Sequence, residues 1–308
     1  MARSRSRIGI SLLFCIALCV SGYGQEAGQS SGPVNPGSPA QADTRDRNLY
    51  EDTSVSSGPV YKRLATNILL DQKDIWTSPF HINRSTAKWW LIVGAGTAAL
   101  IAADHPISQA LPRSGTSVSA GTDLSRLGQW YSVFPFAGGL YAVGRFTDDP
   151  KLEETGALSV QALADAGIAV NVLKVIARRQ RPGDGDYGGH FEKGGSSFPS
   201  GHSTESWALA SVIAHEYGDH RWVPFAAYGF ASVISTSRVL AQEHFTSDVF
   251  VGGAIGFFIG RYVVHTNELH LAHSRRAKWL SPAISPIFDQ DARSVGGRTV
   301  AVNLHWQM

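Results

Sequence analysis

Cysteine is almost absent from this chain. Its 308 residues include two cysteines, Cys15 and Cys19, and both fall within the first twenty residues. If that segment is removed on maturation, the protein has no thiol, no disulfide and no cysteine-based metal site. An excess of one charge is also lacking. The 27 basic and 25 acidic residues leave a net charge of +2, which gives no reason to expect a nucleic-acid partner.

Long hydrophobic runs are missing as well. A membrane-spanning helix needs about 18 or more mostly apolar residues. The strongest run, Trp89–Ala103, stops at Asp104, and the run Val249–Gly260 is followed by Arg261. The mean hydropathy of −0.07 is low for a protein that crosses the membrane several times. We therefore expect a globular body, periplasmic or associated with a membrane surface.

The N-terminus has the pattern of a secretory signal peptide over residues 1–24. Three arginines precede the apolar stretch Ile8–Val20, and small residues follow it, as in cleavable signals. The alternative is an uncleaved anchor helix, although thirteen apolar residues are short for a span. Residues 25–59 are rich in Gly, Ser, Pro, Asp and Gln, which predicts a disordered linker.

From residue 60 the pattern becomes helical, and a hydrophobic content of 43% allows one sizeable domain over residues 60–275. The aromatic residues Trp76, Trp89 and Trp90 fit either an interfacial belt or an ordinary core. In the tail, residues 276–308, alternation from Val300 to Met308 predicts a strand, with Ala283–Phe288 as its hairpin partner. An isolated hairpin is marginal in water, so we expect it to dock on the body or on a second subunit. Helices are expected at about Val60–Gln72, Trp89–Ala103, Gly115–Leu127, Trp130–Gly144, Glu153–Arg179, Ser203–His215, Trp222–Ser235 and Phe245–His265.

Three cations in this domain suit a bound oxyanion. Lys174 and Arg181 lie seven residues apart, so on one helix they would point the same way, and Pro182 would end that helix. Arg238 adds a planar guanidinium suited to bidentate contact with phosphate. Before a helical run, the turn containing Ser200 and Gly201 would bring backbone N–H groups close to an anion.

Two histidines near these cations are candidates for the chemistry. His202 follows the Ser-Gly turn and is placed to protonate a leaving oxygen. His244 and Asp248 are four residues apart, and so neighbours on one helix face. The carboxylate would accept the imidazole Nδ1–H, leaving Nε2 free as a nucleophile.

Taken together, these motifs resemble the type 2 phosphatidic acid phosphatase superfamily, which also contains bacterial acid phosphatases and vanadium haloperoxidases. The residues are Lys174-x6-Arg181-Pro182, Pro199-Ser200-Gly201-His202 and Ser237-Arg238-x5-His244-x3-Asp248. The resemblance implies an all-α helical bundle. It also implies that Lys174, Arg181, Ser200, Gly201 and Arg238 bind phosphate, with His244 as nucleophile, Asp248 as its orienter and His202 as general acid.

We therefore expect a phosphatase that forms a phosphohistidine and hydrolyses phosphate monoesters, lipid phosphates or diphosphates. No metal or cofactor is expected, because the cations fill that role, and vanadate should inhibit as a phosphate mimic. Two alternatives remain from the sequence. One is a vanadium haloperoxidase using the same pocket with His244 as the metal ligand, and the other is a silent lipid-phosphate binder.

Several polar residues beside the motifs have less definite roles. Asp104 and His105 are read as a helix-end cap rather than as support for the site. Arg178 and Arg179 are expected to face solvent or acidic lipid. The glycine-rich segment Gly183–Ser197 is a candidate lid or substrate loop, and its His190 is expected to be a solvated loop histidine.

Overall fold

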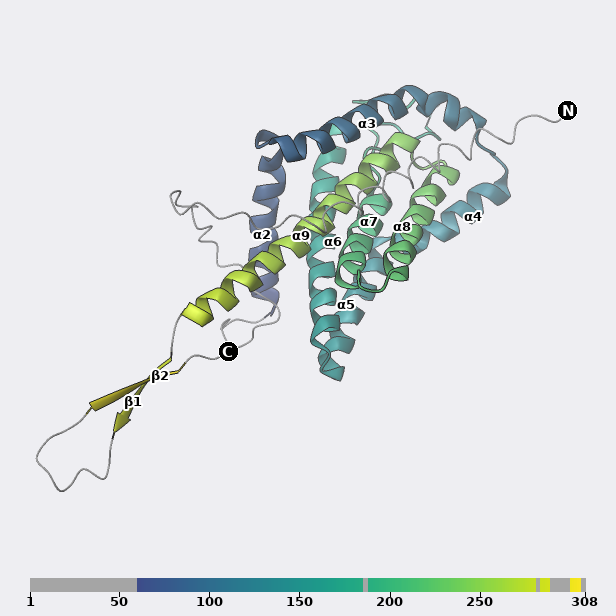
Figure 1. The fold of residues 1–308 in the computed structure, drawn as a ribbon. Helices are drawn as coiled ribbons and strands as arrows, with labels where there is room; N and C mark the ends of the chain where they lie inside the picture. Colours follow the sequence, from purple (N-terminus) through teal and green to yellow (C-terminus); the bar gives the residue numbers. More distant parts are fainter. Residues whose placement is uncertain (1–59, 185–187, 281–282, 289–299, 306–308) are drawn as a thin grey trace, which may run out of the picture.

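The structure, a computed structural model, describes residues 60–184, 188–280, 283–288 and 300–305, with side chains through residue 268 except Ser85. The predicted signal peptide and linker lie outside these residues. The body is helical, as expected (Figure 1). Its elements, in order, are α2 (Val60–Thr77), α3 (Arg84–Ala110), α4 (Gly115–Ser125), α5 (Trp130–Thr147), α6 (Pro150–Ala177), α7 (Gly201–Glu216), α8 (Trp222–Leu240) and α9 (Thr246–Leu280), with short 3₁₀ turns at Ser78–Phe80 and Arg126–Gly128.

Helices α6, α7 and α9 form the centre of the bundle and approach one another through small residues. A Cβ at Gly256 of α9 would lie 2.1 Å from the carbonyl oxygen of Thr204 in α7, so a side chain there would force the helices apart. Figure 1 shows α6, α7 and α8 running side by side, with α9 crossing them and α3 lying across one end. Buried side chains that fill the centre include Leu158, Ala162, Ala166, Ala208, Val212 and Val263.

The ends of α6 and α9 differ from the sequence expectation in a way that matters for the site. Helix α6 begins at Pro150, where the Asp149 side chain accepts a hydrogen bond from the Leu152 N–H. It ends at Ala177, because Arg178 adopts a left-handed conformation with φ of 45°. Pro182 is therefore not what stops it, and Arg181 lies in the following loop. Helix α9 begins at Thr246, so His244 precedes the helix.

Three helices are long and apolar enough to cross a membrane, at Thr86–Ala110, Pro150–Ala177 and Thr246–Glu268. The expectation that no segment meets this standard is wrong. Polar residues were taken to interrupt the apolar runs, but Asp104 and Asp165 are buried inside the fold and leave the outer faces apolar. Large apolar side chains are exposed on α3, α5, α6 and α8, which together with these helices supports a membrane-associated protein.

The three tryptophans do not form one belt. Trp76 packs against the central core and donates its indole N–H to Gln72. Trp89 contacts the edge of the Phe258 ring, whereas Trp90 is exposed. At the other end of the chain, β1 (Ala283–Phe288) and β2 (Val300–His305) pair antiparallel, with Ala283 opposite His305.

Candidate active site

The candidate residues come from three helices and two loops and meet at one end of the bundle. Lys174 lies in the last turn of α6, His202 in the first turn of α7 and Arg238 in the last turn of α8. Their charges, together with those of Arg181 and His244 in two loops, act directly on one another. The structure thus brings together all three cations and both histidines, although Lys174 and Arg181 are not on one helix.

The two arginines share a carboxylate that the sequence did not single out. Glu243 forms an ion pair with Arg181, and its Oε2 lies 3.5 Å from the Nη2 of Arg238. Arg238 is buried and donates from Nη1 to the Ser125 hydroxyl at 2.9 Å. Because two neighbouring guanidinium groups repel each other, the Glu243 carboxylate stabilises their approach. The arginines of the site are therefore held in position by Glu243 and Ser125.

Several buried polar atoms at this end of the bundle have no hydrogen-bond partner within the described residues. They include the Ser200 hydroxyl, the Nε2 of His202 and the Nε of Arg238. Buried polar groups are normally paired, so unpaired ones beside a cluster of cations indicate a site for a polar ligand. Ser200 immediately precedes α7, whose first-turn N–H groups also favour an anion. Lys174 lies close by, since a Cβ at Gly201 would be 3.6 Å from its Nζ.

His244 is held differently from the sequence expectation. Its Nδ1 lies 2.6 Å from the backbone carbonyl oxygen of Ser197, whereas the Asp248 carboxylate oxygen is 3.7 Å away, beyond hydrogen-bond length. Because a carbonyl oxygen only accepts, Nδ1 carries the proton and Nε2 has the free lone pair. Burial, the largest influence, lowers the pKa of His244, so the imidazole is neutral. The predicted tautomer therefore holds, with a different acceptor.

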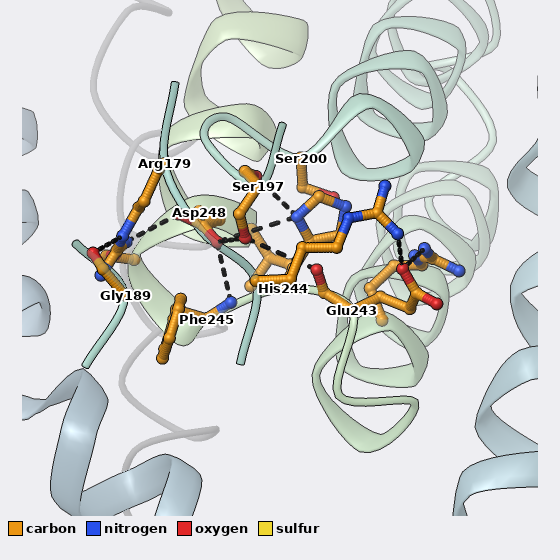
Figure 2. Close-up of polar contacts among 12 residues, drawn as sticks. Arg179, Gly189, Ser197, Ser200, Glu243, His244, Phe245 and Asp248 are labelled. Atoms are coloured by element: carbon orange, nitrogen blue, oxygen red, sulfur yellow. Dashed lines mark hydrogen bonds and ion pairs between the residues drawn. The ribbon is translucent and has the colours of Figure 1, made fainter. Parts of the chain in front are cut away.

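Asp248 supports His244 through the neighbouring backbone (Figure 2). Its Oδ2 accepts hydrogen bonds from the Ser197 hydroxyl at 2.5 Å and from the Phe245 N–H at 2.8 Å. Asp248 therefore links Ser197, whose carbonyl accepts the hydrogen bond from His244, to Phe245, which follows His244 in the chain. Ser197 has no distinguishing pattern in the sequence, and reasoning from motifs missed it.

Arg179 is another residue that was wrongly assigned. Its side chain is 1% exposed rather than solvated, and its Nη1 lies 2.7 Å from the Asp248 Oδ1. Its Nη2 lies 2.8 Å from the Asp104 Oδ2, and Asp104 is inside α3 rather than capping its end. A charged residue two positions from Arg181 looks solvated in a sequence, because only the fold shows that two carboxylates surround it.

The two titratable groups in the first turns of α7 have shifted pKa values. Burial, and then the neighbouring charge of Arg238, lowers the pKa of His202 to about 3. Burial raises the pKa of Glu205 to about 7, against the opposing charge of Lys174. In the ligand-free site His202 is therefore neutral. The sequence did not identify Glu205, since nothing in its local pattern shows that it faces Lys174.

The glycine-rich segment after Arg181 is attached to the body by its backbone. The Gln180 N–H donates to the His190 carbonyl, and the N–H groups of Lys193 and Gly195 both donate to the Arg178 carbonyl. The described residues on either side of 185–187 are therefore attached to the body by backbone hydrogen bonds and do not form a separate lid. His190 itself is exposed, as expected.

Comparison with known proteins finds a family that is similar to part of this chain. Residues 156–270 match the family model of the PAP2 superfamily. A lipid A 1-phosphatase of Porphyromonas gingivalis is 35% identical over 99 residues, which cover 32% of this chain and 20% of that protein. This chain therefore spans about a fifth of the curated relative that it matches.

Two solved structures are also similar. One is LpxE of Aquifex aeolicus, with a TM-score of 0.39, 24% identity, and coverage of 54% of this chain and 95% of that one. The other is a transmembrane PAP2-type phosphatidylglycerolphosphate phosphatase of Bacillus subtilis, with a TM-score of 0.44, 21% identity, and coverage of 67% and 94%. The matched segment 156–270 contains every residue proposed for the site, so the candidate site lies in the part of the chain that is similar to the PAP2 superfamily.

Proposed function

We propose that this protein is a phosphatase that hydrolyses lipid phosphates through a phosphohistidine at His244. The observation that carries the proposal is the state of His244. It is a buried, neutral imidazole whose Nδ1–H is fixed on the Ser197 carbonyl, and it lies among Lys174, Arg238 and His202. A nucleophile in the correct tautomer beside an oxyanion site is the arrangement that in-line phosphoryl transfer requires.

In the first step the phosphate group binds to the cations and the N-terminus of α7. Lys174, Arg181 and Arg238 supply positive charge, while the Ser200 hydroxyl and the Arg238 Nε supply donors that have no partner among the residues that the structure describes. Charge on the equatorial phosphate oxygens is stabilised most in the transition state, so these groups lower the barrier.

The chemistry then proceeds in two displacements. The Nε2 lone pair of His244 forms a bond to phosphorus as the phosphorus–oxygen bond to the leaving group breaks. The departing oxygen takes the bonding electron pair and a proton from His202, which gains that proton when the phosphate dianion binds. Water then attacks the phosphohistidine with His202 as the base, which releases phosphate and restores neutral His244.

A lipid is the substrate class that the surface supports best. Val175 and Ile176, directly after Lys174, are 75% and 66% exposed, so apolar side chains lie on the outer surface beside a phosphate-binding residue. The relative with 35% identity is a lipid A phosphatase by name. Together with the predicted signal peptide, we infer an exported enzyme that acts on membrane lipids.

The substrate class is tested by phosphate release from full-length protein in detergent micelles. Three substrates are compared: a diacylglycerol phosphate, an acylated glycosyl phosphate and p-nitrophenyl phosphate. We expect either lipid to give a kcat/KM at least about tenfold above that of p-nitrophenyl phosphate, because acyl-chain burial adds binding energy. Equal values would contradict a lipid substrate. No phosphate release, with bromination after vanadate loading, would contradict the phosphatase.

The low pKa of His202 leads to a prediction about proton linkage. A bound dianion raises the pKa of His202 from about 3. At about pH 6, between the pKa of His202 without the ligand and its pKa in the complex, oxyanion binding should therefore be accompanied by uptake of a fraction of a proton. Calorimetric titration with orthovanadate in two buffers of different ionisation enthalpy measures this uptake.

The ligand's own protonation contributes to the same signal, so variants isolate the histidine. His202→Gln should remove the extra uptake, while His190→Gln, which changes an exposed histidine in the adjoining loop, should leave it unchanged. Identical uptake in the wild type and His202→Gln would contradict proton gain by this residue.

Glu243 leads to a second prediction, on ligand affinity. In the ligand-free protein its carboxylate neutralises Arg181 and Arg238, the groups that phosphate must engage. Glu243→Gln should therefore tighten orthovanadate binding. The Arg181–Glu243 pair is about one third exposed, so the gain is at most about 1 kcal/mol, or roughly fivefold in Kd.

Glu192→Gln is the matched control, because it removes the same charge from an exposed position in the preceding loop. It should leave the Kd for orthovanadate unchanged. Weaker binding by Glu243→Gln would show that Glu243 instead preorganises the arginines for the ligand.

A further inference from the structure

Helix α3 has an inverted distribution of side chains. Its apolar residues, including Leu91, Ile92 and Ile101, are exposed, whereas Asp104 and Ser108 are buried. The helix packs along α9, where Trp89 meets the Phe258 ring edge at 5.9 Å between centroids. A polar residue is thus the part of α3 that enters the body most deeply, which indicates a specific contact.

That contact is with the residues that surround Asp248. The Asp104 Oδ1 accepts the Ser247 N–H at 3.0 Å, and Oδ2 accepts the Ser247 hydroxyl and the Arg179 Nη2. Arg179 then donates from Nη1 to the Asp248 Oδ1 at 2.7 Å. Figure 2 shows Arg179 and His244 on opposite sides of Asp248, with Ser197 between the carboxylate and the imidazole.

The guanidinium of Arg179 has little freedom to move. Its Nε donates to the Gly189 carbonyl at 2.9 Å. Its centre lies 4.3 Å from the Phe245 ring centroid and 4.8 Å from that of Phe191. Because every donor group is engaged, a shift of Asp104 is transmitted to Asp248 rather than absorbed by rotation of the arginine.

We propose that α3 is a positioning element of the catalytic site, in which Asp104 holds Arg179 and thereby fixes Asp248, Ser197 and the nucleophile His244. The proposal rests on the proposed function and deepens it. Within the described residues, Asp104 and Arg179 do not contact the phosphate-binding cations. They therefore act on the orientation of the His244 imidazole rather than on ligand binding. A helix whose apolar side chains are otherwise exposed thus determines whether the nucleophile is correctly oriented.

The first test separates turnover from binding. Asp104→Asn keeps the shape of the side chain but weakens its hold on Arg179. It should lower kcat about tenfold or more, as loss of outer-shell partners does. The KM and the Kd for inorganic phosphate should stay within about twofold, because no phosphate ligand is changed. An unchanged kcat, or a loss confined to KM and Kd, would overturn the proposal.

The pH profile adds a signature that a purely structural role would not give. Removing the positive charge in Arg179→Gln favours protonated His244, so the acid limb of kcat/KM moves to higher pH. Removing the negative charge in Asp104→Asn moves it to lower pH. Parallel shifts would contradict the proposal, and if Arg179→Gln does not fold, the Asp104→Asn shift alone decides. The charged or titratable groups around His244 are Asp248, Lys174, Arg238, His202, Arg181 and Glu243.

The second test moves α3 without touching the network. At Gly96 a Cβ would lie 3.0 Å from the Phe250 ring of α9, whereas at Gly94 nothing lies within 4 Å. Gly96→Leu should therefore push α3 off α9 and lower kcat, while Gly94→Leu, on the same helix, should not. Combined with Asp104→Asn, Gly96→Leu should add little, because both act through one contact.

Full additivity of the two changes, or wild-type kcat in Gly96→Leu with a shifted unfolding midpoint, would overturn the proposal. Wild-type protein and His244→Ala are assayed in parallel. If the wild type releases no phosphate, the proposed function fails. If the wild type is active and His244→Ala is not, the α3 variants test the positioning role alone.

Discussion

Replacement of His244 by alanine is expected to reduce kcat by about 10⁴-fold or more, equivalent to roughly 5 kcal/mol of transition-state stabilisation. The reason is that the variant loses the atom that forms the bond to phosphorus, while every phosphate ligand remains. The Kd for inorganic phosphate, which forms no bond to His244, should consequently change far less than kcat. Phosphate release from a lipid phosphate measures the first quantity, and calorimetry measures the second.

A trapping experiment tests the role of His244 more directly. Wild-type protein quenched in base during turnover of a radiolabelled substrate should carry an acid-labile phosphate, as a phosphohistidine does, and His244→Ala should carry none. His190→Ala is the matched control, because His190 is an exposed histidine in the adjoining loop. Label of equal yield in His244→Ala would show that another residue is the nucleophile.

Replacement of His202 by glutamine is expected to have an effect that depends on the leaving group. Removing a general acid costs about 10²–10⁴-fold, but only where the departing oxygen needs a proton. The kcat/KM for an alkyl or lipid phosphate should fall by this factor, while the kcat/KM for p-nitrophenyl phosphate should fall much less, because nitrophenolate leaves without protonation.

The two kinetic parameters separate the two roles of His202. kcat/KM includes steps up to phosphohistidine formation, whereas kcat also includes its hydrolysis, in which His202 acts as the base. In His202→Gln, kcat should therefore fall for both substrates, and labelled phosphohistidine should accumulate. Equal losses of kcat/KM for both leaving groups would contradict the general-acid role.

Substitution of Glu205 at the next turn of α7 provides a further comparison. Glu205 has a raised pKa and faces Lys174, but no role in proton transfer to the leaving group is assigned to it. Glu205→Gln should leave the leaving-group dependence of kcat/KM as in the wild type. A dependence like that of His202→Gln would transfer the role of acid to Glu205.

Much of the site was predictable because its members are marked by residue type and spacing. The order from Lys174 to Asp248, with Ser200-Gly201-His202 between, identified the cations and histidines that the fold brings together. Element type was also predictable, since the apolar spacing of the body is helical nearly throughout. The ends of the helices were less predictable, as Arg178 shows. This non-glycine residue ends α6 in a left-handed conformation, and nothing in the local pattern marks that position.

The supporting residues were not predictable, for a different reason. Nothing in the local sequence distinguishes Arg179, Asp104, Ser197 or Glu243. Arg179 was assigned to solvent, and Asp104 was assigned to a helix end. Each acquires its role from a partner between 46 and 75 residues away in the sequence. The three helices long enough to cross a membrane were missed because buried acidic residues were counted as interruptions, whereas the fold turns Asp104 inward.

From the sequence alone came the candidate residues for the site, because imidazole, guanidinium and ammonium groups that suit phosphoryl chemistry follow one another at recognisable spacings. Tertiary structure alone decided how they are held. The Nδ1–H of His244 donates a hydrogen bond to a backbone carbonyl, and Asp248 is held by Arg179 and α3. The physical reason is that hydrogen-bond direction and burial depend on distances between segments far apart in the chain, and local spacing contains no information about those distances.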